Sequence, residues 1–173
     1  MSIHIIIDGY NLIRQSDRLS VIDRRDIQSG REALLNTLAE YRKIKQHKIT
    51  VVFDGTNAPS FSRRGEKLNG VKILFSRNGE LADTVIKRMA LREREKALIV
   101  SSDLDIVNYA ESQGAATISS LEFEEKVIMA VYIDTSGSGM EDKGGWVPTT
   151  KKKGPKRRLS KKKRRSKVKI NKL

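Results

Sequence analysis

Aspartates stand at the ends of three short apolar segments and shortly after a fourth. Asp8 follows IHIII, Asp54 follows ITVVF, and Asp103 comes three residues after ALIV. Asp83 lies eight residues beyond VKILF, in the amphipathic stretch that comes next. Carboxylate oxygens are the ligands that Mg²⁺ and Mn²⁺ prefer in proteins. If the fold brings these side chains together, the pattern indicates a divalent-metal site with oxygen ligands.

The rest of the composition narrows the chemistry. The 173 residues include no Cys and two His, which excludes a thiol nucleophile, a zinc knuckle and a disulfide framework. No Ser-His-Asp arrangement is visible either. Phosphodiester hydrolysis by a metal-activated water needs no protein nucleophile. It also suits a chain whose net charge of +14 favours binding to phosphate groups.

The elements that must position these acids can be inferred from the hydrophobic pattern. Apolar runs predict buried strands at residues 4–7, 49–53, 71–75, 97–100 and 115–118. Amphipathic stretches predict helices over about 26–46 and 80–94, a short helix ending at Gly114, and a last one over 120–131. This alternation favours a three-layer α/β domain with a mostly parallel sheet of about five strands. Near-continuous apolar strands fit burial of both sheet faces.

In such a sheet the carboxyl ends of the strands form the ligand crevice. Asp8, Asp54 and Asp103 are expected at that edge, and the first turn of a helix would bring Asp83 to the same place. Each aspartate taken alone is also a common turn residue or helix cap, and that alternative stays open for each. Taken together, like charges raise one another's pKa unless a cation lies between them, which favours the metal site.

The excess positive charge is concentrated at the C-terminal end. Residues 151–173 include fourteen Lys and Arg and no acidic residue, whereas the first 150 carry equal numbers of each. We expect a folded domain over 1–134, a flexible linker over 135–150 and a disordered basic tail over 151–173, because the tail has little apolar surface to bury. Such a tail would bind RNA phosphates without reading sequence.

Four segments, in order, resemble one known family. They are IIIDGYNLI at residues 5–13, VVFDG at 51–55, FSRNGELADTVIKRM at 75–89 and IVSSDLDI at 99–106. Together they are similar to the YacP-like NYN domain, a branch of the PIN-like nuclease superfamily. The resemblance covers about residues 3–130. It implies a PIN-like, Rossmann-like fold and a metal-dependent endoribonuclease that uses Mg²⁺ or Mn²⁺.

The resemblance also implies roles for individual residues. Asp8 would be a metal ligand, and Asn11 would orient water, metal or phosphate. Asp83 and Asp103 would complete the acidic centre, while Asp54 matches the acid after the second strand. Asp105, two residues past Asp103, is a further candidate metal ligand, although it could equally cap the following helix.

RNA is the expected partner, with the ribosome as a candidate site of action, because one YacP-like branch resembles a ribosome-associated enzyme that cuts mRNA. Arg63 and Arg64, in the loop after the second strand, are candidate RNA contacts. The tail would supply the others, namely Lys151, Lys152, Lys153, Arg157, Arg158, Lys161, Lys162, Lys163, Arg164 and Arg165. No apolar run approaches the length of a membrane span, so we expect a cytoplasmic protein. The resemblance implies a bacterial or organellar setting.

Two other classes of function remain. The main alternative is a non-catalytic RNA- or ribosome-binding module on the same fold, with a degenerate acidic centre. A phosphotransfer protein also uses an Asp after its first strand, but the DxDxT pattern of one such class is absent at Asp8, and a receiver domain gives no account of the basic tail. The oligomeric state is left open.

Overall fold

The computed structural model describes residues 3–57, 66–77, 79–136 and 160–173 of the chain. Its centre is β1 (His4–Asp8), in a six-stranded sheet with the order β3-β4-β2-β1-β5-β6. The other parallel strands are β2 (Lys48–Phe53), β4 (Val71–Phe75), β5 (Ala97–Val100) and β6 (Ala116–Ile118). The short edge strand β3 (Lys67–Leu68) is antiparallel to β4.

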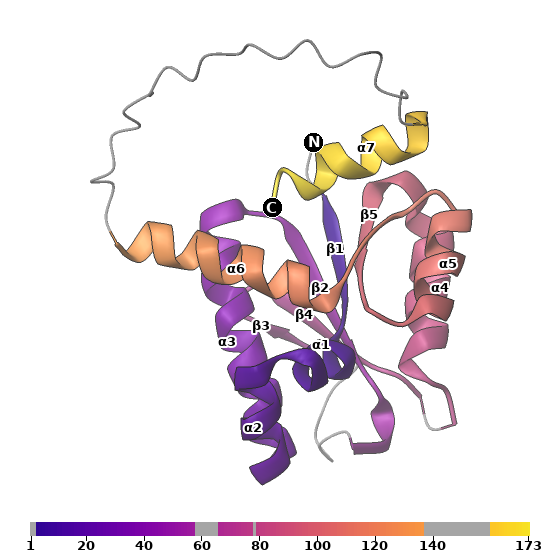
Figure 1. The fold of residues 1–173 in the computed structure, drawn as a ribbon. Coiled ribbons are helices and arrows are strands. Elements are labelled where there is room, and N and C mark those ends of the chain that lie inside the picture. The colour runs from indigo at the N-terminus through magenta and orange to yellow at the C-terminus, as the bar shows by residue number, and fades with distance from the viewer. Residues whose placement is uncertain (1–2, 58–65, 78, 137–159) are drawn as a thin grey trace.

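Helices cover both faces of this sheet and give the predicted three layers (Figure 1). One face packs against α1 (Gly9–Gln15), α2 (Asp17–Arg25), α3 (Ile27–Lys45) and α6 (Ser120–Thr135). The other packs against α4 (Ala82–Glu93) and α5 (Leu104–Ser112). Short 3-10 turns lie at Gly55–Asn57 and Arg94–Lys96. No helix in the described ranges combines the length and apolar character needed to cross a membrane.

The sheet separates two hydrophobic clusters, as the strand alternation requires. Ile5 and Ile7 point into the larger cluster, beneath α1, α3 and α6. Ile6 points into the smaller one, against Ile86 of α4 and Ile106 of α5. Because β1 is buried on both faces, its last residue, Asp8, is held at a fixed place on the carboxyl edge of the sheet.

The five predicted strands and the helices that connect them are confirmed. The helices α1 and α2 were not predicted, because Asp8-Gly9 is also typical of a turn that ends a strand. The Asp8 side chain instead accepts a hydrogen bond from Asn11 N–H and caps a helix that begins at Gly9. A Cβ at position 9 would lie 2.3 Å from the Phe53 ring, so the close approach requires glycine here.

The C-terminal end differs from the expected disorder. Residues 161–170 form α7 (Lys161–Ile170), which lies over the amino ends of β1 and β5 (Figure 1). Leu173 is 6% exposed and belongs to the main core cluster, and its carbonyl accepts a hydrogen bond from the buried Tyr41 hydroxyl. Ile170 and Leu173 pack against the main hydrophobic cluster. The many charged residues around them gave no indication of this contact. Residues 151–159, with most of the predicted linker, lie outside the described ranges, as do Arg63 and Arg64.

Candidate active site

Asp8 lies where the winding of the sheet changes direction. β1 pairs with β2 on one side and with β5 on the other, and the chain completes the β2–β4 side before it returns to add β5. The crevice outside the carboxyl ends of two such strands is the usual ligand site of an open α/β sheet. Asp103 follows β5 and caps α5 with its Oδ1. The two aspartates therefore follow neighbouring strands at the carboxyl edge of the sheet.

The Asp8 carboxylate is buried and held by two hydrogen bonds. Its Oδ1 accepts one from the Asn11 N–H at 3.2 Å, and its Oδ2 accepts one from the Ser101 hydroxyl at 3.3 Å. Burial is the main cause that raises the pKa of Asp8 to about 6. The bond from Asn11 opposes this shift, while the charges of Asp83 and Asp103 add to it.

Asp83 comes to the same edge of the sheet from the first turn of α4, and its charge acts on Asp8. Burial, followed by the charge of Asp103, raises its pKa, and the ammonium of Lys87 opposes the rise. Asp8, Asp83 and Asp103 therefore act on one another through their charges, although they come from three separate parts of the chain. We call these three residues the acid centre. Grouped carboxylates of this kind attract a cation.

Asn11 ties the loops around the acid centre together. Its Oδ1 accepts hydrogen bonds from the Ser102 N–H at 2.9 Å and from the Ser120 hydroxyl at 2.7 Å. A backbone N–H can only donate, so the orientation of the Asn11 amide is fixed with its oxygen toward the protein. The Ser120 N–H in turn donates to the Ser102 hydroxyl at 3.1 Å. Within the described residues the Asn11 Nδ2 has no hydrogen-bond partner, so it is the amide atom available to a ligand.

A lysine accompanies the acids. Lys87 of α4 pairs with Asp105 of α5, and its charge also acts on Asp83 and Asp103. The Asp105 carboxylate is therefore already in an ion pair, and the Asp105 side chain is 76% exposed. The site thus contains one positive side chain that could contact a phosphate.

The Asp54 carboxylate, after β2, is bonded differently from the three of the acid centre. Its Oδ1 accepts hydrogen bonds from the Thr56 N–H at 3.0 Å and the Thr56 hydroxyl at 2.6 Å, and these bonds lower its pKa. Arg14 also lowers the pKa through its charge. The carboxylate is thus satisfied by its own turn and a neighbouring cation, in contrast to Asp8 and Asp83.

The model of the YacP-like NYN domain matches residues 5–171, which is nearly the whole chain. The chain belongs to the YacP-like NYN domain family. This family has a PIN-like nuclease fold, in agreement with the α/β architecture and with the acids at the carboxyl edge of the sheet.

Solved and sequenced relatives agree with the assignment. The chain is 26% identical over 86 residues to the uncharacterized protein YacP of Bacillus subtilis, a match that spans about half of each chain. The crystal structure of Rae1 (YacP) from Bacillus subtilis superposes with a TM-score of 0.66 at 24% identity, and that of a point mutant of the same protein with 0.67 at 22% identity. Each covers 79% of this chain and 79% or 80% of the other. At these identities the likeness concerns the fold.

The donor set of this NYN domain suits a hard divalent cation but does not form a closed cage. All its charged donors are carboxylates, which Mg²⁺ and Mn²⁺ prefer, and two of them have raised pKa values. Among the described residues, no three acidic or histidine side chains are grouped closely enough to hold an ion together. Mg²⁺ commonly keeps several waters and uses one or two carboxylates, so the arrangement fits a water-rich site.

Three residues of this site were not predicted from the sequence. Lys87 follows Asp83 by four residues on one helix face, a spacing that could have indicated it. Ser101 and Ser120 act through tertiary hydrogen bonds that no local pattern reveals.

Five of the predicted tail contacts lie within α7, over the amino ends of the strands and thus away from the acid centre. They are Lys161, Lys162, Lys163, Arg164 and Arg165.

Proposed function

We propose that this NYN domain protein is a metal-dependent endoribonuclease that hydrolyses single-stranded RNA at the acid centre. The observation that carries the proposal is the convergence of Asp8, Asp83 and Asp103 at the carboxyl edge of the sheet, with raised pKa values at Asp8 and Asp83. With a pKa of about 6, Asp8 is mostly ionised at neutral pH, so the bare site repels phosphate. A cation removes that repulsion, and the PIN-like nuclease fold supports this proposal.

Mg²⁺ or Mn²⁺ would be held by carboxylates of the acid centre, with water completing the coordination. When bound, the ion supplies a water of lowered pKa and neutralises charge on the attacked phosphate. Hydrolysis then forms a bond from the water oxygen to phosphorus and breaks the bond from phosphorus to one ribose oxygen. One proton of the water ends on that leaving oxygen.

The side chains of the protein contribute position and charge. Two hydrogen bonds fix the orientation of the Asp8 carboxylate, and Asn11 keeps the loop after β5 in place beside it. Asn11 Nδ2 and the Lys87 ammonium are the groups that would contact a phosphate oxygen. Since neither reads a base edge, we expect little sequence preference from these contacts alone.

The natural RNA is proposed to be mRNA or rRNA at the ribosome, in keeping with the resemblance of the sequence motifs and the basic C-terminal residues. The alternative is an RNA- or ribosome-binding module without catalytic activity. It would bind the same RNA, but added metal would produce no cleavage on free RNA or on ribosome-bound mRNA.

The test is cleavage of end-labelled single-stranded RNA, and of DNA of the same sequence, in Mg²⁺, Mn²⁺ or EDTA. We expect cleavage of RNA with either metal and none in EDTA. Asp83→Asn should abolish it, whereas Asp134→Asn, an exposed acid on α6, serves as the matched control. Binding without cleavage, also on mRNA in translating ribosomes, would support the non-catalytic alternative.

A further inference from the structure

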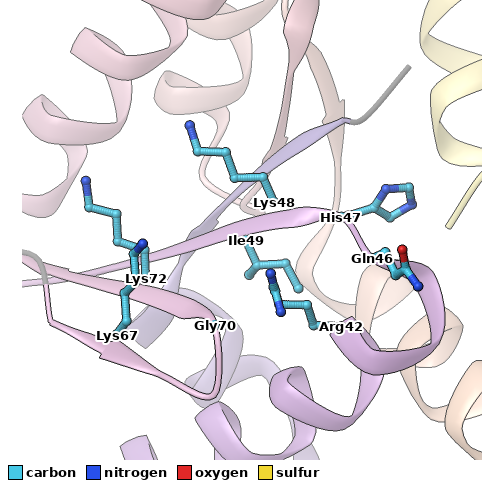
Figure 2. Close-up of a pocket in the computed structure, with 8 residues that line it drawn as sticks. All are labelled: Arg42, Gln46, His47, Lys48, Ile49, Lys67, Gly70 and Lys72. Carbon is cyan, nitrogen blue, oxygen red and sulfur yellow. The ribbon is translucent and has the colours of Figure 1, made fainter.

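A basic pocket lies at the edge of the sheet opposite the acid centre. It has a volume of about 480 Å³, within the range of ligand sites. We call it the amino-edge pocket, and its lining residues are Arg42, Gln46, His47, Lys48, Ile49, Lys67, Gly70 and Lys72 (Figure 2). Four of these residues carry a fixed positive charge and none is acidic.

The cations come from three separate elements. Arg42 lies in the last turn of α3, Lys48 begins β2, and Lys67 and Lys72 belong to the β3–β4 hairpin. Figure 2 shows the three lysine side chains extending to one side of β2 and of the β3–β4 hairpin, with Arg42 beside Ile49 and Gly70. Within the described residues, none of the four forms an ion pair. The charge of Lys48 acts on Glu93, but that carboxylate is already bonded to His4 and Arg92.

One feature of the pocket is unfavourable without a ligand. Lys67 and Lys72 are direct cross-strand partners, and like charges directly opposite each other destabilise a hairpin. An anion with several oxygens would screen this lysine pair. The Arg42 Nε is buried, so Arg42 adds positive charge beside the pocket without donating this N–H to the anion. A lysine on an edge strand also protects against aggregation, but this explains Lys67 and not Arg42 or Lys72.

The turn between β3 and β4 allows Arg42 to approach the hairpin closely. Asn69 and Gly70 have φ values of 47° and 85°, as a two-residue hairpin turn of mirror-image type requires. A Cβ on Gly70 would lie 2.3 Å from Arg42 Nη1, so the glycine allows the guanidinium to lie over the turn. The arrangement thus keeps the Arg42 guanidinium at the pocket.

We propose that the amino-edge pocket binds the phosphodiester backbone of RNA and so holds the strand at a distance from the acid centre. Among the residues that the structure describes, no Phe, Tyr or Trp lines it, so these offer no ring on which a base could stack, and the pocket suits phosphate instead. His47 makes a 3.3 Å contact with the Lys172 carbonyl, which joins the pocket to the end of the basic helix α7. The choice of RNA over another phosphate compound rests on the proposed function.

The distance between the amino-edge pocket and the carboxyl edge of the sheet can be gauged along β2, because Lys48 begins this strand and Asp54 directly follows it. Asp54 lies six positions beyond Lys48, which corresponds to roughly 20 Å at about 3.3 Å per residue. A bound strand that contacts both places must therefore span several nucleotides. The pocket would raise the affinity for long RNA without touching the bond that is cut.

The test measures binding of a fluorescent single-stranded RNA to the full-length chain by anisotropy over a range of salt concentrations. All proteins carry Asp8→Asn and the buffer contains EDTA, so the outcome does not depend on whether the acid centre cleaves RNA. Lys67→Gln/Lys72→Gln removes two pocket charges. Lys43→Gln/Lys45→Gln removes two exposed charges from the same end of α3 that do not line the pocket.

The proposal expects the pocket variant to bind RNA roughly tenfold or more weakly at about 0.1 M salt. The slope of log affinity against log salt should become shallower by about 1.4, or 0.7 for each lost phosphate contact. The control pair should leave the slope nearly unchanged. Equal losses in both pairs, or no loss in the pocket variant, would overturn the proposal.

A second arm distinguishes RNA from a small anion. Inorganic phosphate is titrated against the RNA complex at constant ionic strength, and we expect it not to displace the RNA. Saturable displacement that is lost in Lys67→Gln/Lys72→Gln would identify a site for free phosphate and overturn the assignment to RNA. Circular dichroism and urea unfolding confirm that both variant pairs are folded.

Discussion

The side-chain oxygen of Asn11 accepts a hydrogen bond of 2.9 Å from the backbone N–H of Ser102, which lies 91 residues further along the chain. The same oxygen accepts from the Ser120 hydroxyl, so one amide of α1 joins the loop after β5 to the start of α6. The acid centre is therefore assembled by a half-buried polar link as well as by the sheet. This link sets the geometry of Asp103 relative to Asp8.

Replacing Asn11 with Ala should loosen this assembly. The change leaves the Ser102 N–H and the Ser120 hydroxyl without their acceptor, which costs about 1–3 kcal/mol of unfolding free energy. We expect the cleavage rate to fall more than the affinity for RNA, because the acids are displaced while the basic surfaces remain. Urea unfolding and single-turnover kinetics measure both, with the exposed Asn108→Ala as control. An Asn11→Ala protein with normal stability and rate would contradict this role.

Replacing Asp8 with Asn should stabilise the metal-free protein at neutral pH. The folded-state pKa of Asp8 is raised from 3.8 to about 6. The wild type is therefore most stable, as far as this group is concerned, below about pH 4 and loses up to about 3 kcal/mol as pH rises through 6. Asn caps a helix as well as Asp does but carries no charge, so the variant avoids this loss.

Urea unfolding in EDTA at pH 4 and pH 7 measures the effect. The advantage of Asp8→Asn should be present at pH 7 and shrink toward pH 4. Added Mg²⁺ should stabilise the wild type by mass action and have little effect on the variant. A variant that is less stable than the wild type at pH 7 in EDTA would show that the Asp8 charge is already compensated within the protein.

The strands, and the positions of the aspartates after them, could be predicted because short apolar runs in the sequence are enough to identify each strand. Apolar runs define β1, β2, β4, β5 and β6, and a parallel sheet brings the residues after them to one edge. The helices α1 and α2 could not be recognised in the same way. Asp8 serves at once as the end of a strand, a helix cap and a member of the acid centre, and its pairing with Gly9 is typical of a turn. In α2 only Leu19 is buried, which leaves little periodicity to detect.

The β3–β4 hairpin and the packing of the C-terminal end left only partial signals in the sequence. Asn69-Gly70 is typical of a hairpin turn, but the strand before it, Lys67–Leu68, is too short to show an alternating pattern. In the tail, Ile170 and Leu173 have helical spacing, but fourteen basic residues dominate the composition. The link from Asn11 to Ser102 and Ser120 is purely tertiary, so no sequence pattern could have revealed it.

Removing the charge of Lys87 should change the pH dependence of cleavage. Lys87 lowers the pKa of Asp83, so Lys87→Met should raise that pKa further. Because the acids must ionise to hold a cation, the acidic limb of the pH profile of kcat/KM should move to higher pH. Lys96→Met, an exposed charge between α4 and β5, should leave the profile in place. An acidic limb that stays in place in Lys87→Met would exclude this influence.

Truncating the side chain of Leu173 should destabilise the whole domain. Leu173 is buried in the main cluster, so Leu173→Ala is expected to cost about 2 kcal/mol or more of unfolding free energy. Lys163→Ala, on the exposed side of α7, should change it by less than about 0.5 kcal/mol. If Leu173→Ala changed the unfolding free energy as little as Lys163→Ala does, the C-terminal residues would not pack on the domain in solution.

The most direct test of the nuclease proposal compares single-turnover cleavage of one RNA by the wild type, Asp8→Asn and Asp54→Asn in Mn²⁺, with EDTA as the blank. Asp8 belongs to the acid centre, whereas Asp54 is bonded within its own turn. We predict that Asp8→Asn loses roughly a hundredfold or more of the rate while staying folded, and that Asp54→Asn keeps most of it. Full activity in Asp8→Asn, or cleavage that continues in EDTA, would contradict the account.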